Sequence, residues 1–106
     1  MNAKSSDALP VAARRPIMAL LEQLGRKGTL RILWELRDGA PQSFRLLQTN
    51  AGEMSPSVLN DRLKELRALN IVELAELGYA LTESGVELVK RLKPLNQWAD
   101  RWFAER

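Results

Sequence analysis

The sequence has 106 residues, of which 45% are hydrophobic, and its 16 Lys and Arg against 13 Asp and Glu give a net charge of +3. This length suits one domain, and no apolar run is long enough to cross a membrane, so no membrane partner is expected. Cysteine and histidine are both absent. Disulfides and thiol chemistry are therefore excluded, and zinc sites and Ser-His-Asp triads are disfavoured, so we expect no enzyme, no metal ion and no cofactor.

The N-terminal part is expected to form an arm and two helices. Residues 1–10 predict a flexible arm without the apolar segment of a signal peptide, which favours a cytoplasmic location. The remaining residues, 11–106, are expected to form a single domain. Apolar residues at helical spacing predict a first helix over 11–25 and a second over 28–37, which the Asp-Gly-Ala-Pro sequence at 38–41 ends.

Two more helices are predicted in the middle of the chain. Ser43 is suited to cap a short helix over 44–50, and Ser55 precedes Pro56 at the start of a helix that reaches about residue 69. One face of this helix is apolar, with leucines at i, i+4 and i+7: Leu59, Leu63 and Leu66. Its other face is polar and is expected to point outward: Ser57, Asn60, Asp61 and Lys64.

The pattern then changes to a small hairpin and a final helix. Residues 71–75 and 79–81 favour strands, with a turn at 76–78 between them. Thr82 is suited to cap a last helix that runs to the C-terminus. Pro94 lies inside this helix and is expected to kink or split it, because proline removes one backbone hydrogen bond. The order of elements predicts a mainly α fold, a winged helix-turn-helix with a short β-hairpin wing.

Four stretches resemble bacterial HxlR-type transcriptional regulators. The sequence at 24–33, LGRKGTLRIL, is similar to that family's I-G-G-K-W-T-L-x-I-L, and Phe44 and Leu47 fit its F-x-x-L. The sequence at 55–66, SPSVLNDRLKEL, fits S-P-x-V-L-x-x-R-L-[KR]-E-L, and YALTESG at 79–85 fits Y-x-L-T-x-x-G. The resemblance covers about residues 17–103 and implies a DNA-binding regulator with added N- and C-terminal helices for dimerisation.

The chain departs from that family pattern at three points. Gly28 stands where the family has tryptophan, and the cysteine that some members use to sense oxidants is missing. The hairpin is shorter than in typical members. Its tip, Glu76-Leu77-Gly78, is acidic and has no Lys or Arg. We therefore expect less contact between the wing and DNA than in these relatives.

The resemblance makes the polar face of the 55–69 helix a candidate DNA-binding surface. Asn60 is suited to adenine and Lys64 to guanine or phosphate. Arg62 either binds phosphate or pairs with Asp61 or Glu65. The short side chains near the helix N-terminus and two cations outside the helix are candidates for phosphate contacts. The expected DNA-binding residues are Ser55, Ser57, Asn60, Arg62, Lys64, Lys27 and Arg45.

The terminal helices are the candidate dimer interface. Two tryptophans and a phenylalanine near the chain end either fill the core or meet a partner, and the resemblance favours a homodimer. The expected interface residues are Leu20, Leu24, Leu95, Trp98, Trp102 and Phe103. Such a dimer would bind an inverted-repeat operator in double-stranded DNA, and a small-molecule effector could enter between the terminal helices and the DNA-binding core.

These features favour a dimeric sequence-specific DNA-binding transcriptional regulator of bacterial type. The alternative is a winged-helix protein-interaction module without specific DNA binding. Residues 55–82 support this alternative, because they hold three basic residues against four acidic ones and include the short acidic wing.

Overall fold

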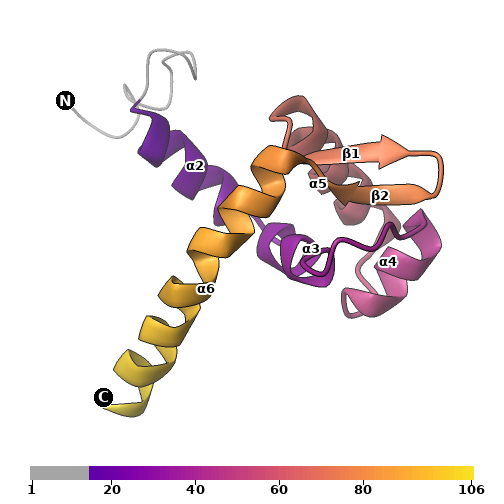
Figure 1. Ribbon diagram of the computed structural model, residues 1–106. Coiled ribbons are helices and arrows are strands. Elements are labelled where there is room, and N and C mark those ends of the chain that lie inside the picture. The colour runs from indigo at the N-terminus through magenta and orange to yellow at the C-terminus, as the bar shows by residue number, and fades with distance from the viewer. Residues whose placement is uncertain (1–14) are drawn as a thin grey trace.

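A computed structural model describes residues 15–106 of the chain, which form a set of helices with one hairpin at the side of the domain (Figure 1). The elements are α2 (Pro16–Leu24), α3 (Thr29–Glu35), α4 (Phe44–Asn50), α5 (Pro56–Ala68), β1 (Val72–Ala75), β2 (Gly78–Leu81) and α6 (Glu83–Ala104). The predicted mainly α, winged helix-turn-helix fold is confirmed. The expected arm over 1–10, and the part of the expected first helix before residue 15, lie outside the described residues.

The helix-turn-helix consists of α4 and α5, and its helix starts follow the sequence signals. The Ser43 hydroxyl oxygen accepts from the Leu46 N–H at 3.1 Å, and the Ser55 hydroxyl oxygen accepts from the Val58 N–H at 3.3 Å. Each cap satisfies a backbone donor that the first helical turn leaves without a partner. The Gln48 side chain donates to the Met54 carbonyl at 2.9 Å and so ties the turn to α4.

The core lies where the apolar faces of α3, α4, α5 and α6 meet the hairpin. The leucines predicted for the inner face of α5 are all buried, and they pack with residues of α3, α4 and the hairpin. The main core residues are Ile32, Leu33, Leu36, Leu47, Leu59, Leu63, Leu66, Val72 and Val89. This packing fixes the rotation of α5 about its axis, and its polar face is therefore held outward.

The hairpin is antiparallel, with Val72 opposite Leu81, and it gains an additional backbone partner from the loop before α4. Gln42 and Tyr79 exchange two backbone hydrogen bonds of 2.9 and 2.8 Å. The predicted turn was one residue too long, because Gly78 belongs to β2. Gly78 has a φ of +132°, and a Cβ there would lie 2.5 Å from the Gln42 carbonyl oxygen. Only glycine fits this close approach of two backbones.

The start of α6 is joined to the end of α5 through Thr82. Its hydroxyl donates to the Asn70 carbonyl at 2.6 Å and accepts from the Gly85 N–H at 3.0 Å. The hydroxyl thus caps α6 and also holds the corner where α5 passes into β1. A Cβ on Gly85 would collide with the Ile71 carbonyl oxygen, so glycine is required at this crossing as well.

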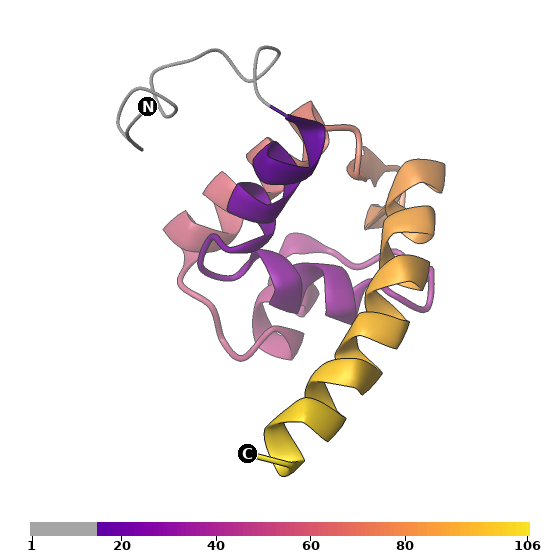
Figure 2. The same ribbon diagram turned by 90° about the vertical axis from the view of Figure 1, so that its left-hand side faces the viewer.

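The expected split of α6 at Pro94 is wrong, since α6 is one helix of 22 residues. Pro94 removes the hydrogen bond to the Lys90 carbonyl, but both residues are exposed, so water can solvate that carbonyl. The C-terminal half of α6 extends beyond the body of the domain in both views (Figures 1 and 2). No helix within residues 15–106 is long and apolar enough to cross a membrane.

Candidate nucleic-acid interface

The outer face of α5 carries a row of exposed polar side chains, as predicted. Ser57, Asn60, Asp61 and Lys64 are all exposed. The row continues one turn further to Arg67, which is also exposed and which sequence reasoning did not select. The sequence could have identified Arg67 by its spacing. It lies three residues after Lys64 and seven after Asn60, and residues at that spacing share one helix face. Arg67 gives this face a second cation and offsets Asp61.

The N-terminus of α5 lies beside this row. The hydroxyl of Ser55 is engaged in capping, and the side chains of Ser55 and Ser57 are exposed. A helix N-terminus presents backbone N–H groups and the positive end of the helix dipole, which favour a phosphate group. Lys27, between α2 and α3, and Arg45, in the first turn of α4, are also exposed to solvent.

Arg62 does not belong to the outer face of α5. Its side chain is only 11% exposed, and its Nε atom lies 3.1 Å from the Glu65 Oε1 atom. The contact is an ion pair without hydrogen-bond geometry, because this Nε has no hydrogen-bond partner among the described residues. Two residues after Asn60, the helix has turned about 200°, which carries Arg62 to the inner side. Arg62 was expected to contact DNA. The structure instead places it inside the fold, where it forms an ion pair with Glu65.

The wing adds no positive charge to the surface. Glu73 and Glu76 are exposed, and so are Leu74 and, at the tip, Leu77, which is 79% exposed. A shallow groove runs between α5 and β1, and Lys64 and Glu73 lie on its opposite sides. Attraction for DNA phosphates in this region thus comes from α5 and not from the hairpin.

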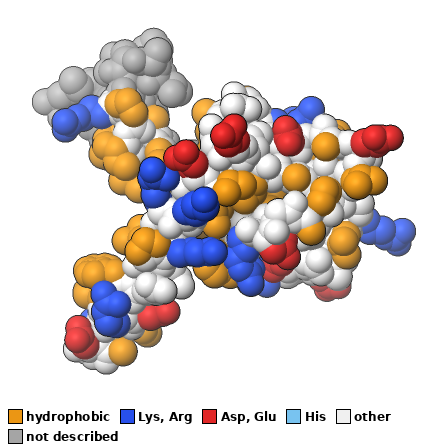
Figure 3. All heavy atoms as spheres, in the orientation of Figure 1, with side chains coloured by type: hydrophobic (Ala, Val, Ile, Leu, Met, Phe, Trp, Pro, Cys, Tyr) orange, Lys and Arg blue, Asp and Glu red, His pale blue; other side chains and the backbone are white. Residues whose placement is uncertain are grey.

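The terminal helices expose apolar side chains, but only part of the expected set. Leu95, Trp98, Trp102 and Phe103 of α6 are 48–69% exposed. The rings of Trp98 and Trp102 stack with their centroids 5.8 Å apart. In Figure 3, hydrophobic side chains gather on both projecting helices, α2 and α6.

Leu24 was expected in the dimer interface, and this prediction is wrong. Its side chain is 8% exposed and belongs to the hydrophobic core. Leu20 is partly buried and packs against the same core. The exposed apolar face of α2 is made of three other residues: Ile17, Met18 and Leu21. Sequence periodicity identified α2 as amphipathic. It did not show which part of its wide apolar stripe meets the core, since that depends on the angle at which α2 crosses the domain.

A helix-turn-helix with a polar outer face on its second helix and an adjoining hairpin defines the class of winged-helix DNA-binding regulators. A model of the HxlR-like helix-turn-helix matches residues 23–106. The chain belongs to the HxlR family and is an HTH-type transcriptional regulator.

Individual relatives agree with this assignment. The chain is 31% identical over 90 residues to an uncharacterised HTH-type transcriptional regulator of Methanocaldococcus jannaschii, a match that covers 80% of this chain and 83% of that protein. It is similar to the crystal structure of quinone-bound YodB from B. subtilis, with a TM-score of 0.75, 30% identity and coverage of 81% and 97% of the two chains.

A possible HxlR family transcriptional factor from Thermoplasma volcanium has a TM-score of 0.71 and 29% identity, over 86% of this chain and 87% of that one. Of the two functions that the sequence allowed, these matches support the DNA-binding regulator over the protein-interaction module.

Proposed function

We propose that the protein is a homodimer that binds an inverted-repeat operator by placing α5 of each protomer in the major groove. The observation that carries this proposal is the orientation of α5. Its leucines are buried, and Asn60, Lys64 and Arg67 are exposed along one line at the surface. In helix-turn-helix proteins the second helix of the motif contacts base edges in this way.

The proposed roles follow from side-chain chemistry. Asn60 forms paired hydrogen bonds with adenine, and Lys64 binds guanine acceptors or phosphate. Asp61 accepts a hydrogen bond from cytosine or excludes other bases. Phosphate contacts come from the remaining exposed residues around α5: Ser55, Ser57, Arg67, Lys27 and Arg45.

Dimerisation uses the exposed apolar faces of the terminal helices. The stacked pair Trp98 and Trp102 on α6, together with Ile17 and Leu21 on α2, buries apolar surface against the same residues of a second protomer. Two α5 helices related by this axis would lie about one DNA turn apart, roughly 34–36 Å.

A small effector would bind between α3 and α6. A pocket of about 400 Å³ between α3 and α6 has a mainly apolar lining, which includes Leu30, Trp34 and Leu92. YodB has been solved with a bound quinone. This chain has no cysteine, so an effector here would be held without a thiol adduct. A planar apolar ligand would quench the fluorescence of Trp34, and Trp34→Leu should remove that change.

Fluorescence anisotropy with fragments of the source genome, at two salt concentrations, tests DNA binding. We expect selective retention of some fragments and an affinity that falls as salt rises. Lys64→Ala should weaken binding and lower the slope of log affinity against log salt by about 1. Leu77→Ala, at the tip of the wing, is the matched control and should leave both quantities unchanged. If no fragment is bound at either salt concentration, the proposal is wrong.

A further inference from the structure

One carboxylate oxygen connects α2 with α5. The Oε1 atom of Glu65, on α5, accepts from the Gln23 side-chain amide at 2.9 Å. The same oxygen lies 3.1 Å from the Arg26 Nε and 3.1 Å from the Arg62 Nε. Gln23 belongs to α2 and Arg26 lies two residues after the end of that helix, whereas Arg62 belongs to α5. We call these four residues the α2–α5 latch.

The latch is partly shielded from water. The side chains of Glu65 and Arg62 are 28% and 11% exposed, and that of Arg26 is 51% exposed. Charge interactions at such depth are screened less than those between fully exposed residues. Arg62 holds the carboxylate from within α5, and Gln23 and Arg26 reach it from α2. The latch therefore has an inner part that orients Glu65 and an outer part that connects the two helices.

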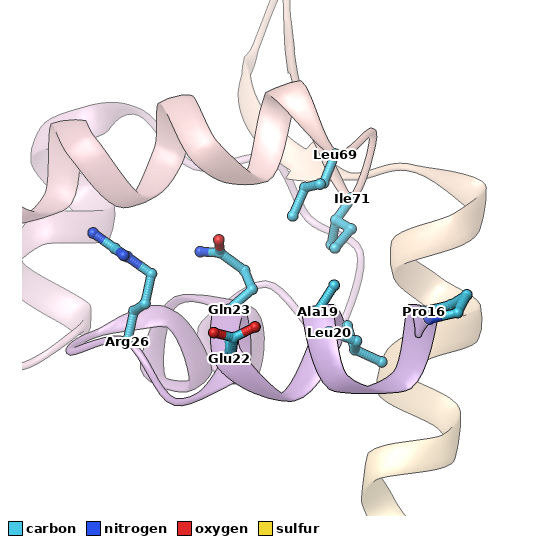
Figure 4. A pocket seen from close by; sticks show the side chains of 8 residues that line it. All are labelled: Pro16, Ala19, Leu20, Glu22, Gln23, Arg26, Leu69 and Ile71. Carbon is cyan, nitrogen blue, oxygen red and sulfur yellow. The ribbon is translucent and has the colours of Figure 1, made fainter. Parts of the chain in front are cut away.

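The rest of α2 is separated from the end of α5 by an open pocket. Its volume is about 460 Å³, and its polar wall includes Gln23 and Arg26. Figure 4 shows Leu69 and Ile71 pointing into the pocket from the side opposite Ala19 and Leu20. The side chains of Gln23 and Arg26 point toward α5 in the same view. The C-terminal end of α2 is thus fixed by Leu24 in the core and by the latch, and its N-terminal end lies beside a hollow.

The connection between α2 and α3 contains two glycines. Gly25 ends the helix, and Gly28 has a φ of +90° just before α3. Glycines have few steric limits on backbone rotation. Without the outer part of the latch, the core contacts of Leu20 and Leu24 would be left to hold α2 at its angle to α5.

We propose that Glu65 is a positioning residue: by holding Gln23 and Arg26 it sets the angle between α2 and α5, and so the spacing between the two α5 helices of the dimer. This inference rests on the proposed function, in which α2 belongs to the dimer interface and α5 binds DNA. Any signal that separates Arg26 from Glu65 would change which operator spacing the dimer accepts.

The test uses the double variant Gln23→Leu with Arg26→Met. It removes the outer part of the latch, keeps the side-chain volumes similar and leaves the Arg62–Glu65 pair in place. Anisotropy is measured on inverted repeats whose half-site separation is changed by one or two base pairs in each direction. The parent protein should prefer one separation by about tenfold or more, and the variant should lose most of that preference. A role in stability alone would lower affinity equally at every separation.

Glu87→Gln is the matched control. It breaks an ion pair of the same length, 3.1 Å between Glu87 and Arg91, on the exposed surface of α6, and should keep the parental separation profile. An unchanged profile in the latch variant would overturn the inference while the proposed function stands. A parent protein without DNA binding would overturn both.

A second measurement reports the geometry without DNA. Because the chain has no cysteine, Asp61→Cys provides one labelling site on the exposed face of each α5. Spin labels at this site should give a narrow distance distribution between protomers, and a broader one in the latch variant. Equal widths would contradict the inference.

Discussion

Polar residues that are neighbours in the sequence of α5 differ in their exposure to solvent, and this difference shows which of them face outward. Asn60 and Lys64 are exposed, whereas Arg62 between them is 11% exposed and paired with Glu65. The sequence left open whether Arg62 binds phosphate or forms an ion pair within the helix. Helical geometry alone points it away from Asn60, but only the packed domain shows that α2 covers that side.

Exchanging the two cations for alanine should therefore change stability to different extents. Arg62→Ala removes a mostly buried charge and its packing, and should lower the free energy of unfolding by about 1–3 kcal/mol. Lys64→Ala removes an exposed side chain and should change that free energy by no more than about 0.5 kcal/mol. Urea unfolding of both variants measures the difference. Equal losses of stability would contradict the assignment of Arg62 to the fold.

At the scale of elements, capping residues in the sequence predicted the starts of α4 and α5, whereas the first helix was expected from residue 11 and α2 begins at Pro16. The Ser-Pro pair before α5, and Ser43 before α4, act through contacts within a few residues, so both caps formed as predicted. The split expected at Pro94 did not occur: α6 continues through the proline at a place where both Pro94 and Lys90 are exposed to solvent. The pairing of Gln42 with Tyr79 has no local signal, since the two residues are far apart in the chain.

Gly78 is the residue on which that long-range pairing depends. Gly78→Ala would place a Cβ 2.5 Å from the Gln42 carbonyl oxygen at a φ of +132°, and should cost more than about 2 kcal/mol. Gly52→Ala is the control. It also has a positive φ, +81°, but meets no atom within 4 Å, so its cost should be about 1–2 kcal/mol. Thermal unfolding compares them, and a smaller loss for Gly78→Ala would show that the close approach is absent.

At the scale of the whole molecule, the α6 aromatics and the exposed part of α2 point to a second protomer. The sequence predicted the exposed apolar residues of α6. On α2 it selected Leu24, which is buried in the core. A buried and an exposed leucine of one amphipathic helix look alike until the crossing angle of the helix is known.

Trp102→Glu should disrupt the dimer. The substitution places a charge within the stacked aromatic surface, where burial against a partner would require its desolvation. Sedimentation equilibrium should give twice the chain mass of 12.0 kDa for the parent and the single mass for the variant. Leu77→Glu is the control. Leu77 is an even more exposed apolar residue, but it lies on the wing and outside the proposed interface, so this variant should remain dimeric. A monomeric parent would rule out the proposed interface.

Under the proposed function, two copies of α5 bind an inverted repeat through their outer faces. Selection of binding sites from random DNA with the purified protein measures whether they do. We predict an enriched inverted repeat with half-site centres about 10–10.5 base pairs apart, or a multiple of that distance. Asn60→Ala should relax the choice of base at one position in each half-site. Enrichment of no sequence, or of one without two-fold symmetry, would contradict the account.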